Sequence, residues 1–95
     1  MRQRRLSDRS LKAIKPAASG QRYDVMETEL RGFGIRVTDK GQRTFILFTR
    51  YPGSTNPTRR ALGDYPTMSL ESARAKAKLW RELIAKGIDP KDGLS

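Results

Sequence analysis

Apolar and polar residues alternate most clearly in two neighbouring stretches in the middle of the chain. Residues 32–38, GFGIRVT, place their three large apolar side chains at odd positions, and residues 44–51, TFILFTRY, form the longest run rich in β-branched and aromatic side chains. Both features are typical of β-strands. We expect these stretches to be adjacent strands of one sheet, flanked by strands at 23–27 and 58–62.

The connection between the two central strands predicts how they pair. Residues 39–41, DKG, have the composition of a three-residue hairpin loop with glycine in the left-handed conformation. A loop of this length places Thr38 opposite Gln42, and it therefore places Ile35 opposite Phe45. A shift of one residue would exchange the two faces of the strand.

This register sorts the central strands into two faces. Phe33 and Ile35 lie opposite Leu47 and Phe45, on an apolar face that we expect to pack against a helix. On the other face, Gly34 is either a bulge or twist point, or a place where another group closely approaches the backbone. The same face holds the residues that we predict to contact a ligand: Arg36 (opposite Thr44), Thr38, Thr44, Ile46, Phe48 and Arg50, with Arg59 and Ala61 on the flanking strand.

Near the C-terminus, apolar residues recur at every third or fourth position, as in a helix, and no longer at every second position as in a strand. Ser69 is a good N-cap and Gly87 a good C-terminal residue, so a long helix is expected between them. Its apolar stripe consists of Leu70, Ala73, Ala77, Trp80 and Ile84. The cations of this helix are scattered, which favours a scaffold over the alternative of a basic recognition helix. A shorter helix is expected to begin at Ser7 and to end before Pro16.

These elements predict an α+β fold: a three- to four-stranded antiparallel sheet packed against a long C-terminal helix, with a short N-terminal helix. Residues 1–6 would be a basic arm that is disordered on its own, and 7–88 the folded domain. A turn is expected at 63–66. Residues 89–95 would begin a linker, with no structure in the last five residues.

Charge indicates the class of partner. The chain has 20 Lys and Arg residues against 10 Asp and Glu, a formal net charge of +10. Such an excess favours nucleic acid over a merely basic domain. The N-terminal arm is then either a solvated terminus or a segment that follows a DNA groove. Cations in the arm and loops are predicted to contact the phosphate backbone: Arg2, Arg4, Arg5, Lys40, Arg43 and Arg60.

The residue types present give little support for a catalytic function. Histidine and cysteine are both absent, which removes the commonest general base and the usual metal ligands. We predict no catalytic residue, no metal site, no cofactor and no small-molecule substrate. No apolar run reaches the length of a membrane span, and the N-terminus lacks a signal peptide, so we expect a cytoplasmic protein that does not contact a membrane.

Two apolar residues on the polar face leave alternatives open. Ile46 and Phe48 are either covered by the short N-terminal helix or make apolar contacts with bases or with a partner. An RNA-binding module would stack bases on Phe48. A protein-interaction domain would use Ile46 and Phe48, with Leu79 on the outer side of the long helix.

Five segments, in order, resemble the N-terminal arm-type DNA-binding domain of phage and genomic-island tyrosine integrases. They are LSDRSLKAIKP (6–16), YDV (23–25), LRGFGIRVTDKGQRTF (30–45), RRALGDYPTMSLESARAKA (59–77) and GIDP (87–90). No single segment is specific, but together they cover most of the chain.

The resemblance implies the ligand and the setting. The exposed sheet face would bind arm-type sites in double-stranded attachment-site DNA, with its strands in the major groove. Recombination chemistry would lie in a separate C-terminal domain, so this chain by itself would not be an enzyme. Its partners would be DNA and the other domains and protomers of the integrase, a bacterial or phage protein associated with the nucleoid.

Overall fold

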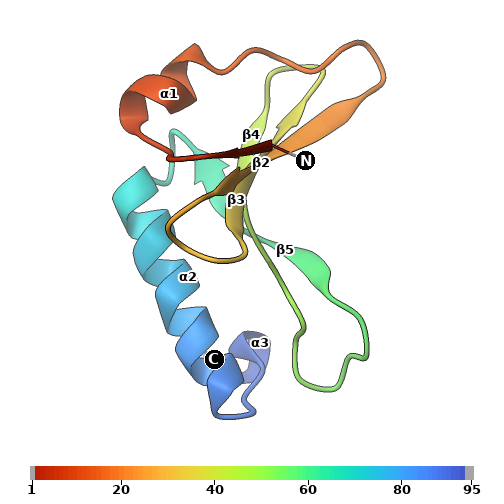
Figure 1. Cartoon of the computed structure of the whole chain (residues 1–95), viewed down its shortest axis with the longest axis vertical. Coiled ribbons are helices and arrows are strands. Elements are labelled where there is room, and N and C mark those ends of the chain that lie inside the picture. The colour runs from red at the N-terminus through yellow and green to blue at the C-terminus, as the bar shows by residue number, and fades with distance from the viewer. Residues whose placement is uncertain (1, 94–95) are drawn as a thin grey trace.

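The computed structural model describes the backbone of residues 2–93 and the side chains of residues 4–91. A five-stranded sheet in the order β1-β2-β3-β4-β5 forms one layer, and the helices form a second (Figure 1). The strands are β1 (Arg2–Arg4), β2 (Arg22–Glu27), β3 (Phe33–Thr38), β4 (Arg43–Thr49) and β5 (Thr58–Tyr65). The helices are α1 (Asp8–Ala13), α2 (Leu70–Ala85) and α3 (Pro90–Gly93).

The predicted α+β architecture is confirmed, since β2 to β5 are antiparallel and both α1 and α2 are present. The ends of the chain differ from expectation. Arg2–Arg4, predicted to be disordered, pairs in parallel with β2 because that strand would otherwise expose its backbone groups at the sheet edge. Residues 91–93, predicted to lack structure, belong to the short helix α3 that begins at Pro90.

The predicted register of the central hairpin is confirmed. The backbone N–H of Thr38 donates to the carbonyl of Gln42 at 3.0 Å, and Gly41 has a φ of 83° in the left-handed region. The observed pairs are those that the loop length predicted: Phe33 with Leu47, Ile35 with Phe45, and Arg36 with Thr44. The composition of one loop therefore assigned every side chain of two strands to its face.

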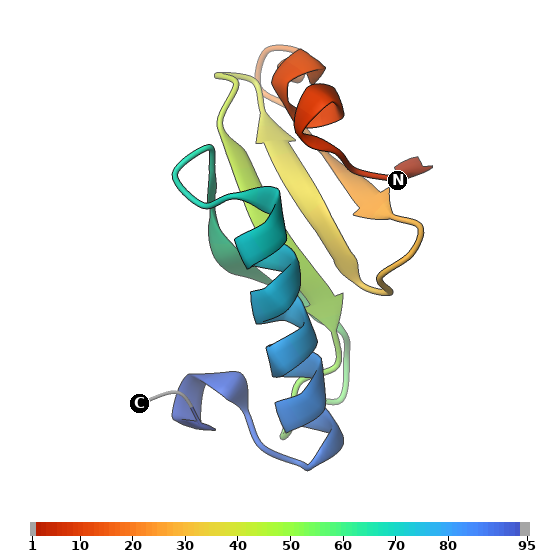
Figure 2. The same cartoon turned by 90° about the vertical axis from the view of Figure 1, so that its left-hand side faces the viewer.

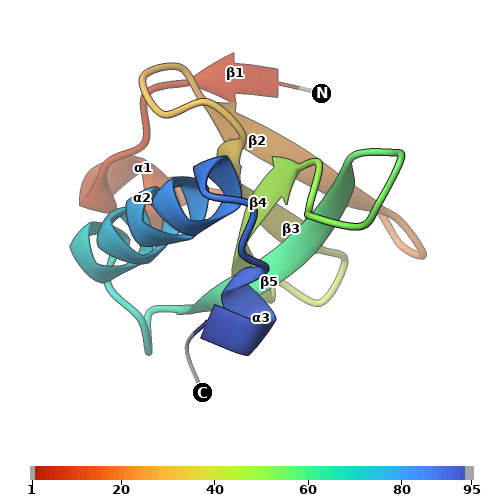
Figure 3. The same cartoon turned by 90° about the horizontal axis from the view of Figure 1, so that it is seen from below.

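The hydrophobic core lies between the sheet and the helices α1 and α2, which occupy the same side of the sheet (Figures 2 and 3). The rings of Phe33 and Phe45 stack with centroids 5.8 Å apart. Ala73 and Ala77 are fully buried, which brings α2 close to these rings, and Trp80 fills the next turn of the helix. The apolar stripe predicted for the long helix is therefore the face that covers the sheet.

Both helix starts and the end of α2 follow the predicted signals. Ser7 and Ser69 accept hydrogen bonds at 3.1 Å from backbone N–H groups three residues later. Gly87, with a φ of 77°, follows the last turn of α2, and the N–H of Ile88 reaches back to the carbonyl of Leu83 at 2.9 Å. The short α1 buries Leu11 in the core and depends on this packing for its stability.

Strand β5 is longer than predicted. The expected turn at 63–66 is largely strand, because β5 continues to Tyr65 and the chain turns after it. A bulge permits this continuation: Phe45 pairs with Gly63 and Ile46 with Ala61, which leaves Leu62 as the extra residue. Leu62 is buried in the core.

A buried carboxylate joins three elements on the helix side. The Glu27 side chain, at the end of β2, is 1% exposed. It accepts a hydrogen bond of 2.5 Å from the backbone N–H of Leu6 and forms an ion pair with Arg74 of α2. Arg74 also donates to the Leu6 carbonyl at 2.9 Å. This junction ties the segment between β1 and α1 to both the sheet and the long helix.

Candidate nucleic-acid interface

The sheet face without helices, which we call the open face, carries side chains from four strands. Alternation along each strand and the observed pairing define its members. They are Arg22, Asp24, Met26, Gly34, Arg36, Thr38, Thr44, Ile46, Phe48, Arg59, Ala61 and Asp64. Seven of the eight sheet residues predicted from the sequence therefore share one surface, and the eighth, Arg50, is exposed just beyond the end of β4.

Two arginines of the open face converge on one carboxylate. The Nε of Arg36 donates to Asp24 at 2.9 Å, and the Nε of Arg59 donates to the other oxygen of Asp24 at 2.6 Å. Arg59 lies on β5 and Asp24 on β2, so this contact crosses two intervening strands. Within residues 4–91, no further hydrogen bond engages the terminal nitrogens of either guanidinium, which leaves them available to a ligand.

The protonation of Asp24 is coupled to this contact. Burial raises the pKa of Asp24, but the hydrogen bonds and charges of Arg36 and Arg59 outweigh burial, so the pKa lies below its ordinary value of 3.8. The carboxylate is therefore ionised at neutral pH and holds both guanidiniums in place.

The coupling predicts a pH-dependent contribution to stability. Because the pKa of Asp24 is lower in the folded state, the carboxylate stabilises the fold above pH 3.8, and this contribution disappears as the pH falls through the lowered pKa. We expect Asp24→Asn to lower the free energy of unfolding at pH 7 by about 1.5 kcal/mol. Urea unfolding of both proteins from pH 7 to pH 2 measures the difference, which should vanish at the acid end; a constant difference would contradict the coupling.

The apolar residues of the open face are covered by neighbours on that face. The predicted alternative, in which the short N-terminal helix covers Ile46 and Phe48, is wrong, because α1 packs on the opposite face. Ile46 is only 3% exposed and pairs with Gly34 and Ala61. Phe48 is half-buried beneath the guanidinium of Arg59, whose carbon lies 4.4 Å from the ring centroid.

Gly34 marks a close approach between two strands. A Cβ at this position would lie 2.6 Å from the carbonyl oxygen of Val25 and 2.8 Å from the sulfur of Met26. The group that approaches the backbone therefore belongs to β2 of the same chain. The thioether of Met26 occupies the space over Gly34 and adjoins the buried Ile46 in the same row of paired residues.

A second carboxylate, that of Asp64, places another negative charge among the cations of the open face. The hydroxyl of Thr44 donates to Asp64 at 2.7 Å across the β4–β5 pair. Neither Asp24 nor Asp64 was among the residues predicted from the sequence to contact DNA. The alternation of residues 23–27 could have indicated Asp24, because the hairpin between β2 and β3 places it opposite Arg36.

Predicted backbone contacts occupy the rims of the sheet. Arg4 and Arg5 are exposed beside β1, and Arg5 forms a loose ion pair of 3.6 Å with Glu29. Lys40 is exposed at the tip of the β3–β4 hairpin. The backbone of Arg2 pairs with β2, but its side chain lies outside the described part.

Arg43, also predicted to contact the DNA backbone, lies on the helix side. It has the same parity as Phe45, and its Nη1 donates to the carbonyl of Leu11 in α1 at 2.9 Å. Its guanidinium carbon also lies 5.0 Å from the centroid of the Tyr65 ring. These contacts attach α1 to the sheet, and they place Arg43 away from the open face.

Arg60, the remaining predicted backbone contact, also turns toward the helix side. Its two terminal nitrogens donate to the Asp89 carboxylate at 2.7 and 3.1 Å, and its guanidinium carbon lies 3.8 Å from the centroid of the Tyr51 ring. The hydrogen bond from Arg60 and that from the backbone N–H of Lys91 lower the pKa of Asp89. Burial raises the pKa of Tyr51 to about 12. Arg60 therefore fastens the segment before α3 to β5.

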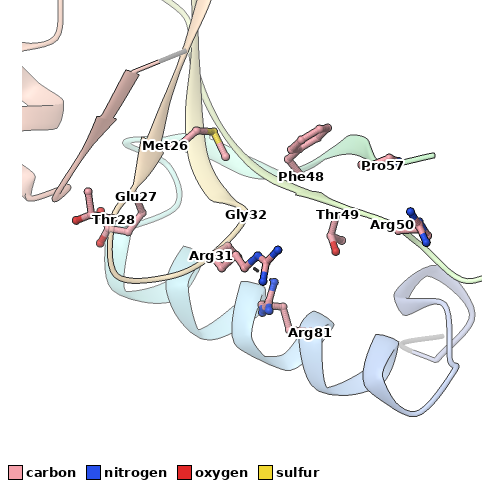
Figure 4. A pocket seen from close by; sticks show the side chains of 10 residues that line it. All are labelled: Met26, Glu27, Thr28, Arg31, Gly32, Phe48, Thr49, Arg50, Pro57 and Arg81. Atoms are coloured by element: carbon pink, nitrogen blue, oxygen red, sulfur yellow. Dashed lines mark hydrogen bonds between the residues drawn. The ribbon is translucent and has the colours of Figure 1, made fainter.

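A hollow of 720 Å³ adjoins the open face at the end of β4 (Figure 4). Phe48 belongs to both surfaces. Three arginines from separate parts of the chain line the hollow, and we call it the arginine hollow: Arg31 from the β2–β3 loop, Arg50 after β4, and Arg81 from α2. Nothing in the local spacing of the sequence brings these three arginines together, so the sequence alone did not predict the hollow.

Comparison with known proteins identifies the family. The sequence profile of the Arm DNA-binding domain matches residues 6–93. The chain belongs to this family. It is 37% identical over 60 residues to the integrase of Enterobacteria phage P4, a match that covers 63% of this chain and 14% of that protein. It is 33% identical over 90 residues to the prophage integrase IntA of Escherichia coli K12, which covers 92% of this chain and 20% of that protein.

This arm DNA-binding domain spans at most a fifth of the length of these relatives. Family membership and the integrase relatives support DNA as its ligand. Within the described residues, no three acidic side chains gather as they would around a metal ion. No helix among residues 2–93 combines the length and apolar character needed to cross a bilayer.

Proposed function

We propose that this domain attaches a site-specific tyrosine integrase to arm-type sites in double-stranded DNA, with the open face in the major groove. The observation that carries the proposal is the pair of guanidiniums, Arg36 and Arg59, that one carboxylate holds on the helix-free face. Family membership and the net charge of +10 support it. The catalytic residues would lie elsewhere in the parent integrase, whose other domains and protomers would be partners in the nucleoid.

The open face offers the groups that reading of base edges requires. The terminal nitrogens of Arg36 and Arg59 suit the O6 and N7 acceptors of guanine, and the methyl group of Ala61 suits the thymine methyl. Thr38 and Thr44 offer hydroxyl groups that can contact either kind of base edge. Because Ile46 is buried, we assign it a structural role beneath these contacts.

The rims of the sheet would contact the sugar–phosphate backbone. Arg4, Arg5, Lys40 and Arg50 are exposed and flank the open face. Such contacts fix the register and orientation of a protein on the duplex, but they carry little sequence information. Base contacts would therefore come from the centre of the open face, and affinity from its margins.

Binding is expected to depend strongly on salt. If about six phosphates are neutralised, the logarithm of the association constant should fall with the logarithm of salt concentration with a slope of about −5. Fluorescence anisotropy with an arm-site duplex at several salt concentrations gives the slope. NMR titration of the same duplex should shift resonances of the open face and leave the outer side of α2 unchanged. A flat salt response, or shifts confined to α2, would overturn the proposal.

Two further binding measurements separate the remaining alternatives. An RNA-binding module should prefer single-stranded RNA in competition with duplex DNA, and stacking would have to use Phe48, which Arg59 already covers. A protein-interaction domain should self-associate or bind its partner without DNA. Of the apolar surface predicted for such a domain, Ile46 is buried, at 3% exposed, whereas Leu79 on α2 is 43% exposed.

A further inference from the structure

We propose that the arginine hollow binds one phosphate group of the DNA backbone beside the bases that the open face contacts. This inference rests on the proposed function for the source of the phosphate, but the chemistry of the hollow is independent of it. The hollow gathers positive charge from three separate elements at the end of the sheet. On the open face, by contrast, Arg36 and Arg59 both pair with the carboxylate of Asp24.

The charge of the arginine hollow has no partner among the described side chains. None of Arg31, Arg50 and Arg81 has a carboxylate oxygen within ion-pair distance in residues 4–91. The only carboxylate in its lining is that of Glu27, which Leu6 and Arg74 already occupy. Like charges held close together repel each other, and an anion between them relieves this repulsion.

The hollow holds one of its arginines, Arg81, in a fixed position. Arg81 is half-buried, and its Nη1 donates to the backbone carbonyl of Arg31 at 2.9 Å (Figure 4). This bond fixes the guanidinium of Arg81 beside the loop that carries the guanidinium of Arg31. Planar guanidiniums match the oxygen geometry of a phosphate group and can bind it through two parallel hydrogen bonds. Hydroxyl groups of Thr28 and Thr49 also line the hollow.

The position of the hollow indicates a phosphodiester of bound DNA as the occupant. Phe48 lines the hollow and also lies on the open face under Arg59. A duplex placed over the open face would therefore bring its backbone to the mouth of the hollow at the end of β4. A contact of this kind would fix the position of the duplex on the sheet without selecting its sequence.

The test removes the charges of Arg31 and Arg81 and measures the salt dependence of DNA binding. Arg31→Gln combined with Arg81→Gln should weaken binding to arm-site and scrambled duplexes alike, by about 3- to 10-fold at moderate salt, and should reduce the steepness of the salt slope by about 1. Arg9→Gln combined with Lys12→Gln, at exposed positions on α1, removes the same two charges and should leave the slope unchanged. An unchanged slope in the double variant would overturn the proposal.

A second measurement separates the hollow from the proposed function. Inorganic phosphate, added at constant ionic strength against chloride, should shift the Nε–Hε resonances of Arg31 and Arg81 in the wild-type protein and saturate. If DNA binds but phosphate shifts neither resonance, the hollow proposal fails and the open face stands. If phosphate binds but duplex DNA does not, the proposed function fails, and the hollow is a site for free phosphate, which overturns the DNA backbone as its occupant.

Discussion

Glu27→Ala is expected to lower the free energy of unfolding by about 3 kcal/mol, the largest effect of any single change considered for this domain. The substitution removes the carboxylate that accepts the N–H of Leu6 and pairs with Arg74. Both groups would then lose a buried partner, which costs more than the bond itself contributes. Urea unfolding followed by circular dichroism measures the loss.

A neighbouring residue provides the control for this prediction. Glu29 forms an ion pair with Arg5 in which the side chains are 58% and 75% exposed, so Glu29→Ala should cost less than about 1 kcal/mol. Glu27→Gln keeps an acceptor for Leu6 but removes the charge opposite Arg74, and it should fall between the two. Equal effects of Glu27→Ala and Glu29→Ala would show that the junction contributes little to stability.

Arg59→Ala is expected to weaken binding to an arm-site duplex by about 10- to 100-fold and to leave binding to scrambled DNA much less affected. Arg59 is the cation of the open face that contacts both Asp24 and Phe48, so its terminal nitrogens have a fixed direction. A guanidinium that is ordered before binding loses less entropy when it meets a base. Anisotropy competition between the two duplexes measures the change in specificity.

The adjacent residue is a matched control for this second prediction. Arg60 is the next residue of β5, but it turns to the helix side and binds Asp89. Arg60→Ala removes the same charge from the same strand, so it should lower stability without relaxing the preference for the arm-site duplex. Equal losses of specificity from the two substitutions would contradict the assignment of the open face.

Most of the fold and much of the open face could be predicted because both depend on local patterns. The hairpin loop at 39–41 fixed the pairing of β3 with β4, and with it the faces of Phe45 and Ile46. The long helix followed from its cap and its apolar stripe. Such signals act over a few residues, and the chain contains them without reference to distant contacts.

Several features that the sequence did not predict depend on distant parts of the chain. Strand β1 forms because β2 has a free edge, and the ends of the chain carry no local sign of it. The contact between Arg59 and Asp24 joins residues that lie 35 positions apart and three strands away from each other. The arginine hollow joins Arg31 to Arg81 across 50 positions. Charge alone indicated that cations matter, but only the tertiary fold determines which ones meet.

The bulge in β5 has a consequence for how relatives of this domain should be aligned. Before Leu62, odd-numbered residues of the strand point to the open face, as Arg59 and Ala61 do; after it, an even-numbered residue, Asp64, does so. A gap placed before Arg60 instead of at Leu62 would assign Arg60 to the wrong side of the sheet. In this strand, the number of residues before Tyr65 therefore decides which side chains lie on the open face, as much as the identity of each residue does.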